Sequence, residues 1–97
     1  MAGVVTRDDA VAALTGVVDP ELGVDIVSLG LVYGVDVDAC DVVAVTMTLT
    51  TAGCPLHDAI EGGVHRALER AGARSTRVDV VFDPPWTPER MGAPIPA

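Results

Sequence analysis

Cys54 is the residue of this sequence best placed for chemistry. It lies between Gly53 and Pro55, where an alternating stretch gives way to a stretch with helical spacing. Because proline favours the first position of a helix, Cys54 is predicted to cap a helix N-terminus. Unpaired backbone N–H groups and the helix dipole at that position stabilise a thiolate, which binds soft metals or attacks electrophiles. The alternative is that Cys54 is an inert residue of the core.

The neighbours of Cys54 determine what its sulfur can do. Gly53 allows a tight turn and leaves open space beside the sulfur, and Thr50 and Thr51 place hydroxyl groups close by. His57 follows three residues later and is the only candidate base for a thiol-dependent enzyme. The sequence contains no Ser-His-Asp arrangement, phosphate-binding glycine loop or dinucleotide fingerprint, so no complete catalytic set is recognised.

Two further groups could carry chemistry. His57, Glu61 and His65 recur every four residues, but the two histidines are eight residues apart rather than four, which favours a solvated helix face over a metal site. Cys40 lies in a predicted turn and is expected to be exposed. A strand separates it from Cys54 by more than about 20 Å, so an intramolecular disulfide is not expected.

Hydrophobic spacing predicts the elements that position Cys54. Thr6 and Asp9 form a capping box for a helix over residues 7–18, which Asp19 and Pro20 end. A turn over 19–23, an extended piece over 24–29 and a break at Gly30 follow. Alternation then predicts a hairpin of strands 31–37 and 43–50 around a polar turn, with Tyr33 and Val35 on one face of the first strand and Val32 on the other.

The second half of the chain continues the pattern. Apolar residues at helical spacing predict a second helix over about 55–71, ended by Gly72. Gly62 and Gly63 inside it indicate either local weakness or close approach of the helix backbone to a neighbour. A third strand over 77–82 is followed by one helical turn at 87–91 with Thr87 as its cap.

These elements predict an α+β domain of two layers, in the order helix, strand, strand, helix, strand, with a three-stranded mixed sheet and both helices on one face. The second helix crosses between the second and third strands, which are therefore parallel. Whether they are neighbours or the first strand lies between them stays open. One domain is expected over residues 1–97, with residues 92–97 as a frayed tail.

Composition excludes several classes of function. The 97 residues include 6 Arg or Lys against 14 Asp or Glu, giving a net charge of −8. Nucleic-acid or anionic-membrane binding, which needs basic patches, is therefore not expected. Two cysteines are too few for a disulfide scaffold, and the sequence shows no signal peptide or long apolar run. A cytoplasmic protein is expected, and so small a core would gain from a partner subunit in a dimer.

Three stretches carry a family resemblance: residues 19–33 (DPELGVDIVSLGLVY), 47–56 (MTLTTAGCPL) and 83–91 (DPPWTPERM). Together they resemble the MIP18-like (DUF59) family, which includes SufT-type iron–sulfur assembly factors and PaaD-type proteins of phenylacetate degradation. The resemblance covers about residues 7–91 and implies a small α/β fold. The chain lacks the cysteine-rich extension of PaaD-type proteins, which favours the SufT-like interpretation.

The resemblance implies an auxiliary factor for iron–sulfur cluster assembly or delivery rather than an enzyme. It assigns the family's reactive cysteine to Cys54, which we expect to be the metal ligand. From their position beside Cys54, we expect Thr50, Thr51 and Gly53 to complete the cofactor site. The expected cofactor is iron or a labile iron–sulfur cluster. Expected partners are the iron–sulfur assembly machinery and client apo-proteins, through two motifs: Asp19, Pro20 and Glu21, and Pro84, Pro85 and Trp86.

Ligand number limits the mechanism that the resemblance implies. Clusters usually need four ligands, mostly thiolates, so one chain is not expected to hold a stable cluster. Cys54 from each chain of a symmetric homodimer, completed by exogenous thiols or a client, could hold a labile one. Trp86 is either a partner anchor or a plug over the end of the sheet. The alternative function is a metal-free adaptor that recognises clients in a maturation or phenylacetate-degradation complex.

Overall fold

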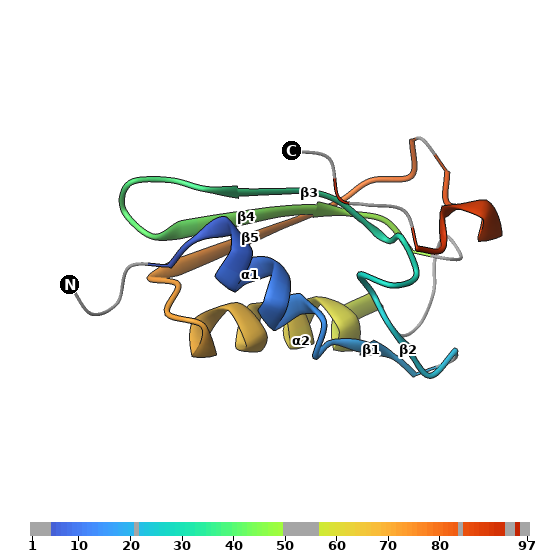
Figure 1. Cartoon of the computed structure of the whole chain (residues 1–97), viewed down its shortest axis with the longest axis horizontal. Helices are drawn as coiled ribbons and strands as arrows, with labels where there is room; N and C mark the ends of the chain where they lie inside the picture. Colours follow the sequence, from blue (N-terminus) through green and yellow to red (C-terminus); the bar gives the residue numbers. More distant parts are fainter. Residues whose placement is uncertain (1–4, 21, 50–56, 84, 93–94, 96–97) are drawn as a thin grey trace.

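The computed structural model describes residues 5–20, 22–49, 57–83, 85–92 and 95, and the backbone alone of His57. Its elements are α1 (Arg7–Leu14), β1 (Val18–Asp19), β2 (Val24–Asp25), β3 (Val32–Val37), β4 (Val42–Met47), α2 (His57–Arg70), β5 (Ser75–Val80) and the 3-10 helix η1 (Pro88–Arg90). Figure 1 shows two layers, with α1 and α2 on one face of the sheet. The predicted α+β architecture is confirmed, with a small β1–β2 hairpin added to it.

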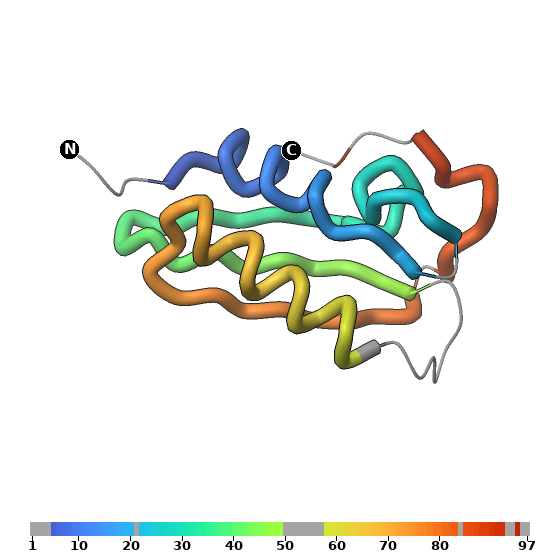
Figure 2. Tube along the Cα trace, turned by 90° about the horizontal axis from the view of Figure 1, so that it is seen from below, coloured from blue at the N-terminus to red at the C-terminus, as the bar shows by residue number. Residues whose placement is uncertain are grey.

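The three-stranded sheet has the order β3-β4-β5, which resolves the question that the sequence left open. β3 pairs with β4 in antiparallel fashion, and β4 pairs with β5 in parallel along its whole length. The crossover helix α2 lies across the sheet between these two parallel strands (Figure 2). The second and third predicted strands are therefore direct neighbours, and β4 is the central strand.

The strands follow their predicted alternation in β4 but not in β3. Val43, Val45 and Met47 are fully buried on the helix-facing side of β4. In β3 the register shifts between Val32 and Gly34, so Tyr33 is an extra residue in the ladder. Such a bulge turns the side chains that precede it toward the other face. The prediction that Val32 and Val35 lie on opposite faces is wrong. Val32 pairs with Met47 and Val35 pairs with Val45, so both lie on the helix-facing side, where both are buried.

The first helix is shorter than predicted. Thr6 and Asp9 form the expected capping box, but α1 ends at Leu14 instead of residue 18. Thr15 and Gly16 are weak helix formers, and beyond them the backbone pairs with another strand. The carbonyl of Val17 accepts the N–H of Ile26 at 2.9 Å, and Val18 pairs with Asp25. Pairing within the hairpin therefore replaces the last helical turn.

The predicted extended piece over 24–29 is also wrong after its second residue. β2 stops at Asp25, whose carboxylate accepts the N–H of Ser28 at 2.9 Å and so begins a turn. The turn closes when the Leu31 N–H donates to the carbonyl of Ile26 at 3.0 Å. Ile26, Leu29 and Leu31 are fully buried, so residues 26–31 form a compact turn that contributes to the core. We call this segment the 26–31 turn.

The space around Gly63 in α2 would admit a Cβ, so both interpretations of the Gly62–Gly63 pair stay open. A Cβ built on Gly63 would lie 3.4 Å from Cγ1 of Val17, in van der Waals contact with the chain that follows α1. Gly72, with φ of 111°, follows the end of α2 as predicted. On the sheet-facing side α2 buries three apolar side chains against the strands: Ile60, Val64 and Leu68.

The last strand ends earlier than predicted, and the chain then returns across the 26–31 turn. β5 stops at Val80, and Phe82 is 44% exposed beyond it. The predicted helical turn is present as η1, with Thr87 before it. Of the tail expected to be frayed, Gly92 donates its N–H to the carbonyl of Ser28 at 2.7 Å, and Ile95 packs against the core.

Candidate functional site

The candidate site lies at the end of the molecule where β4 ends. Four predicted site residues, Cys54, Thr50, Thr51 and Gly53, lie outside the described residues. The described residues that flank this segment are Leu49, which is 4% exposed, and His57, the first residue of α2. The described geometry of the site is therefore that of the residues that flank and support this segment.

The exit of β4 is held from both sides by backbone hydrogen bonds. The N–H of Thr48 donates to the carbonyl of Leu31 at 2.8 Å, and the N–H of Val81 donates to the carbonyl of Met47 at 2.8 Å. Thr48 and Met47 are fully buried. The chain is thus fixed by the 26–31 turn on one side and by the end of β5 on the other, just before the segment that contains Cys54.

The Asp-Pro-Glu motif is placed by the β1–β2 hairpin. Asp19 is 3% exposed, an unusual position for a carboxylate, and its carbonyl accepts the N–H of Gly23 at 2.8 Å. Pro20 is exposed, and Glu21 lies outside the described residues. The predicted turn over 19–23 is confirmed, and it presents one buried acid beside one exposed proline.

The Pro-Pro-Trp motif packs on the 26–31 turn. Pro84 lies outside the described residues, and Pro85 is exposed. The Trp86 side chain is half-buried, contacts the core and donates its Nε1–H to the carbonyl of Leu29 at 2.7 Å. The indole of Trp86 is therefore anchored on the 26–31 turn.

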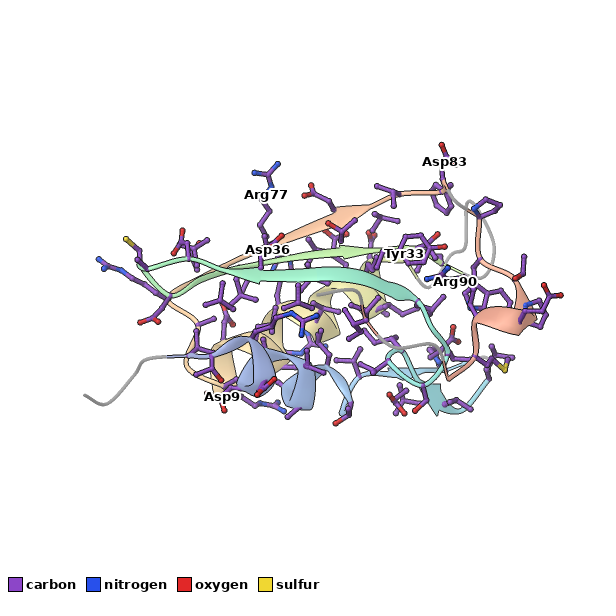
Figure 3. The ribbon with its side chains drawn as sticks, turned by 45° about the horizontal axis from the view of Figure 1, so that its top comes forward. Asp9, Tyr33, Asp36, Arg77, Asp83 and Arg90 are labelled. Carbon is purple, nitrogen blue, oxygen red and sulfur yellow. The ribbon has the colours of Figure 1, made fainter. Side chains whose placement is uncertain are left out.

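Arg90 makes a second contact between the same two segments. Its guanidinium carbon lies 4.4 Å from the centre of the Tyr33 ring, a cation–π geometry (Figure 3). Its Nε also donates to the carbonyl of Gly30 at 3.4 Å. Residues 86–92 therefore clasp the 26–31 turn, and we call them the C-terminal clasp. The sequence marked Gly30 as a break in the chain but gave no signal that Arg90 would reach it.

Asp25 is the described acid with a perturbed pKa. Partial burial raises the pKa of this carboxyl. Hydrogen bonds from the side chain and backbone of Ser28, together with the backbone N–H groups of Val27 and Asp25, outweigh it, and the pKa lies below its ordinary value of 3.8. The charged carboxylate therefore holds the start of the 26–31 turn. Sequence reasoning did not single out Asp25, although an acid three residues before a serine is a common turn signal.

The remaining sequence candidates lie away from this end. Cys40 is exposed in the turn between β3 and β4, as predicted. His65 hydrogen-bonds through Nδ1 to the Thr76 hydroxyl on β5, and its Nε2 lies 4.0 Å from Glu61. His65 thus joins α2 to the sheet instead of lying on a freely solvated face.

The described residues do not supply a metal site by themselves. Within the described ranges, no three His, Cys, Asp or Glu side chains come together as potential metal ligands. Among these same residues, no helix is long and apolar enough to cross a membrane. The arrangement provides a rigid frame for one segment, and any ion held there would need ligands from that segment or from another molecule.

Comparisons with known proteins agree with the motif resemblance. The sequence profile of a family described as "Iron-sulfur cluster assembly protein" matches residues 7–80. The chain is 49% identical over 86 residues to the Fe-S protein maturation auxiliary factor YitW of Bacillus subtilis, covering 88% of this chain and 84% of that protein. It is 50% identical over 76 residues to the Fe-S protein maturation auxiliary factor SufT of Staphylococcus aureus, covering 77% and 86%.

Longer proteins and solved structures extend the likeness. The chain is 40% identical over 74 residues to an iron-sulfur cluster carrier protein of Deinococcus radiodurans, covering 75% of this chain but 21% of that protein. A DUF59 domain of Bacillus anthracis superposes with a TM-score of 0.85 at 43% identity, over 90% of this chain and 84% of that one. A conserved hypothetical protein of Thermotoga maritima gives 0.85 at 46% identity, over 96% and 92%.

Proposed function

The chain belongs to the iron–sulfur cluster assembly protein family, and on that premise we propose that it is an auxiliary factor that delivers iron or a labile cluster through Cys54. The cargo is the substrate of this role rather than a resident cofactor. The observation that carries the proposal is the convergence of the three family motifs on the exit of β4.

That convergence can be followed contact by contact. The first motif supplies Leu31, whose carbonyl accepts the N–H of Thr48 from the second motif. The third motif supplies Trp86, whose indole donates to Leu29 of the first. Residues 83–91 thus brace residues 19–33, and these brace the strand that leads to Cys54. Such bracing suits a segment whose sulfur must be presented in one geometry.

The comparisons support an auxiliary role in the maturation of iron–sulfur proteins. Relatives about half identical to this chain carry the name Fe-S protein maturation auxiliary factor. The match to one fifth of a longer iron-sulfur cluster carrier protein indicates that the same unit also occurs joined to a carrier. We infer that this chain works beside such carriers and passes cargo to client apo-proteins.

Ligand chemistry explains why the cargo would be labile. Cys54 is the one thiol of the second motif, and a cluster usually needs four ligands. The described frame offers no group of three ligating side chains to complete them. Exogenous thiols, a second Cys54 or the client itself must supply the rest, and weakly held cargo transfers readily to a client with a full ligand set.

Each of the two partner motifs exposes a proline. Pro20 and Pro85 are exposed, so both can contact a client or carrier directly. The Trp86 indole N–H is occupied by Leu29, and we propose that Trp86 supports that surface from beneath instead of inserting into a partner. The role we propose for this chain is delivery, not catalysis.

A transfer assay tests this role. The chain is loaded anaerobically with ferrous iron and sulfide and mixed with apo-ferredoxin, whose visible absorption reports the arrival of a cluster. We expect transfer from the natural chain and from the matched variant Cys40→Ala, and loss of transfer from Cys54→Ala. Equal transfer from Cys54→Ala and Cys40→Ala would refute the role of Cys54.

A further inference from the structure

A groove runs between the two helices on the side of the molecule away from the sheet. It has a volume of about 720 Å³ and is lined by residues of α1, of α2 and of the chain that leads into β1. Figure 2 shows α1 and α2 lying side by side in front of the sheet. No family motif accounts for this groove, apart from Pro20 at its end.

Half of the fourteen residues that line the groove are Ala or Gly. Ala12 and Gly16 on α1 and the following turn, and Ala59 on α2, are exposed and line it. Val18 at one end is 50% exposed. Small side chains on both walls allow another helix to approach closely. An exposed helical face with this composition differs from the charged face that a solvated helix usually presents.

The acidic and the basic residues of the groove lie on opposite walls. Asp9 lies on the α1 wall and points away from the sheet (Figure 3), and Arg66 and Arg70 lie on the α2 wall. Among the described residues, neither arginine forms an ion pair. The two helices run in opposite directions (Figure 2), so Asp9 near the start of α1 and Arg70 at the end of α2 lie at the same level along the groove.

We propose that a second copy of this chain fills the groove, through a two-fold axis that runs parallel to it. Half a turn about such an axis exchanges the two walls without moving any residue along the groove. Asp9 of each copy then faces Arg66 and Arg70 of the other, and α1 of each copy packs on α2 of the other. Both pairs form twice, as an isologous interface requires.

The charge pattern selects this occupant over a foreign acidic segment. An acidic segment that reached Arg66 and Arg70 would also meet Asp9 on the facing wall, where like charges repel. A second copy satisfies both walls at once. The chain has a net charge of −8, so two copies repel each other over most of their surfaces. At the groove the arginines of one copy face the aspartate of the other, and the charges there attract.

The size of the groove sets the strength of the dimer. Fourteen residues line it, compared with about 20–30 residues on each side of a standard interface. The dimer is therefore weak and reversible. The dimer also bears on how the proposed delivery of cargo works, and this part of the inference rests on that proposed function. Both α2 helices begin at the same end of the dimer, and Cys54 precedes α2 in each chain, so two copies can share one cargo.

A charge-exchange experiment tests the interface by sedimentation equilibrium over a range of concentrations. Arg66→Glu/Arg70→Glu and Asp9→Arg should each weaken self-association on the order of tenfold, because each places like charges across the groove. An equimolar mixture of these two variants should associate again, since each copy then meets opposite charges at both contacts. The matched control Arg74→Glu/Arg77→Glu changes the net charge equally outside the groove and should dimerise like the natural chain.

A second set of variants leaves Asp9 unchanged, because Asp9 also caps the start of α1. Ala12→Trp fills the groove from an exposed position and should abolish association, whereas Ala39→Trp in the exposed β3–β4 turn should not. Thermal melting of each variant verifies folding. If Asp9→Arg does not fold, the Ala12 arm decides.

Three results would overturn the inference: a natural chain that stays monomeric at all concentrations, an association that survives Arg66→Glu/Arg70→Glu, or a mixture that fails to associate. A monomer whose groove amide signals shift on adding a poly-glutamate peptide would assign the groove to a foreign acidic segment instead, and would also overturn it. The transfer assay with Cys54→Ala judges the proposed function separately, so a monomer that still delivers cargo refutes the interface alone.

Discussion

Gly30 and Arg90 approach so closely that a Cβ built on Gly30 would stand 2.1 Å from the carbonyl oxygen of Arg90. Gly30 also has a φ of +76°, which disfavours any other residue. The C-terminal clasp therefore closes over the 26–31 turn at a position where only glycine fits. Because this turn also braces the exit of β4, the clasp stabilises the frame of the Cys54 segment.

The first prediction concerns this contact. Gly30→Ala should lower the free energy of unfolding by about 2–5 kcal/mol, combining backbone strain of about 1–2 with overpacking of about 1–3. Gly23→Ala is the matched control, because Gly23 has a φ of +69° but no atom within 4 Å of its Cβ position. Urea denaturation measures both. A Gly30→Ala variant no less stable than Gly23→Ala would show that the clasp is not closed.

The second prediction concerns Trp86, the only tryptophan of the chain. Trp86→Phe keeps an aromatic ring but loses the 2.7 Å hydrogen bond to the Leu29 carbonyl. We expect a loss of about 0.5–1.5 kcal/mol in the free energy of unfolding. The Gly92 amide, which donates to Ser28, should exchange its hydrogen faster in the variant. Unchanged exchange at Gly92 would mean that Trp86 does not hold the clasp.

The third prediction concerns a buried hydroxyl. Thr48 is fully buried, and among the described residues its Oγ1 has no hydrogen-bond partner. Thr48→Val removes that unsatisfied group and should raise the free energy of unfolding by about 1 kcal/mol. Thr46→Val, at a half-buried position of the same strand, should change it by less than about 0.5 kcal/mol. A clear destabilisation by Thr48→Val would indicate that the hydroxyl has a role near the exit of β4.

The fourth prediction concerns pH. The pKa of Asp25 is lowered below 3.8 because hydrogen bonds from Ser28 outweigh partial burial. A depressed pKa means that the stabilisation is complete above the unfolded value of about 3.8 and is lost as the pH falls through the folded value. Asp25→Asn should remove this part of the pH dependence of stability. An NMR titration that placed the Asp25 pKa at or above 3.8 would contradict the geometry.

The sequence predicted the parts of the fold whose cause lies within one helix or strand, and it missed the parts that depend on pairing between segments. The hairpin of β3 and β4 followed from alternating side chains, and α2 followed from its apolar spacing, because both patterns lie within one element. The helix end at Leu14 was missed, because Val18 continues the helical spacing while its backbone pairs with Asp25. The bulge at Tyr33 was missed because the pattern of a single strand does not reveal the register of its pairing.

The same distinction between local and long-range causes applies to the candidate site. Cys54 stood out through the local sequence Gly-Cys-Pro, and the motif around Asp19 predicted its turn. The contacts of Trp86 with Leu29 and of Arg90 with Gly30 join residues 57 and 60 positions apart. No local pattern carries information over such separations. The anchoring of Trp86 on the 26–31 turn therefore became visible only in three dimensions.

The most direct test of the account is whether Cys54 holds iron. Anaerobic incubation with ferrous iron and sulfide, followed by native mass spectrometry, reports bound iron and the number of chains together. The account predicts iron on the natural chain and on Cys40→Ala, with cluster-bearing species at the mass of two chains, and none on Cys54→Ala. Equal iron on Cys54→Ala and Cys40→Ala would contradict it.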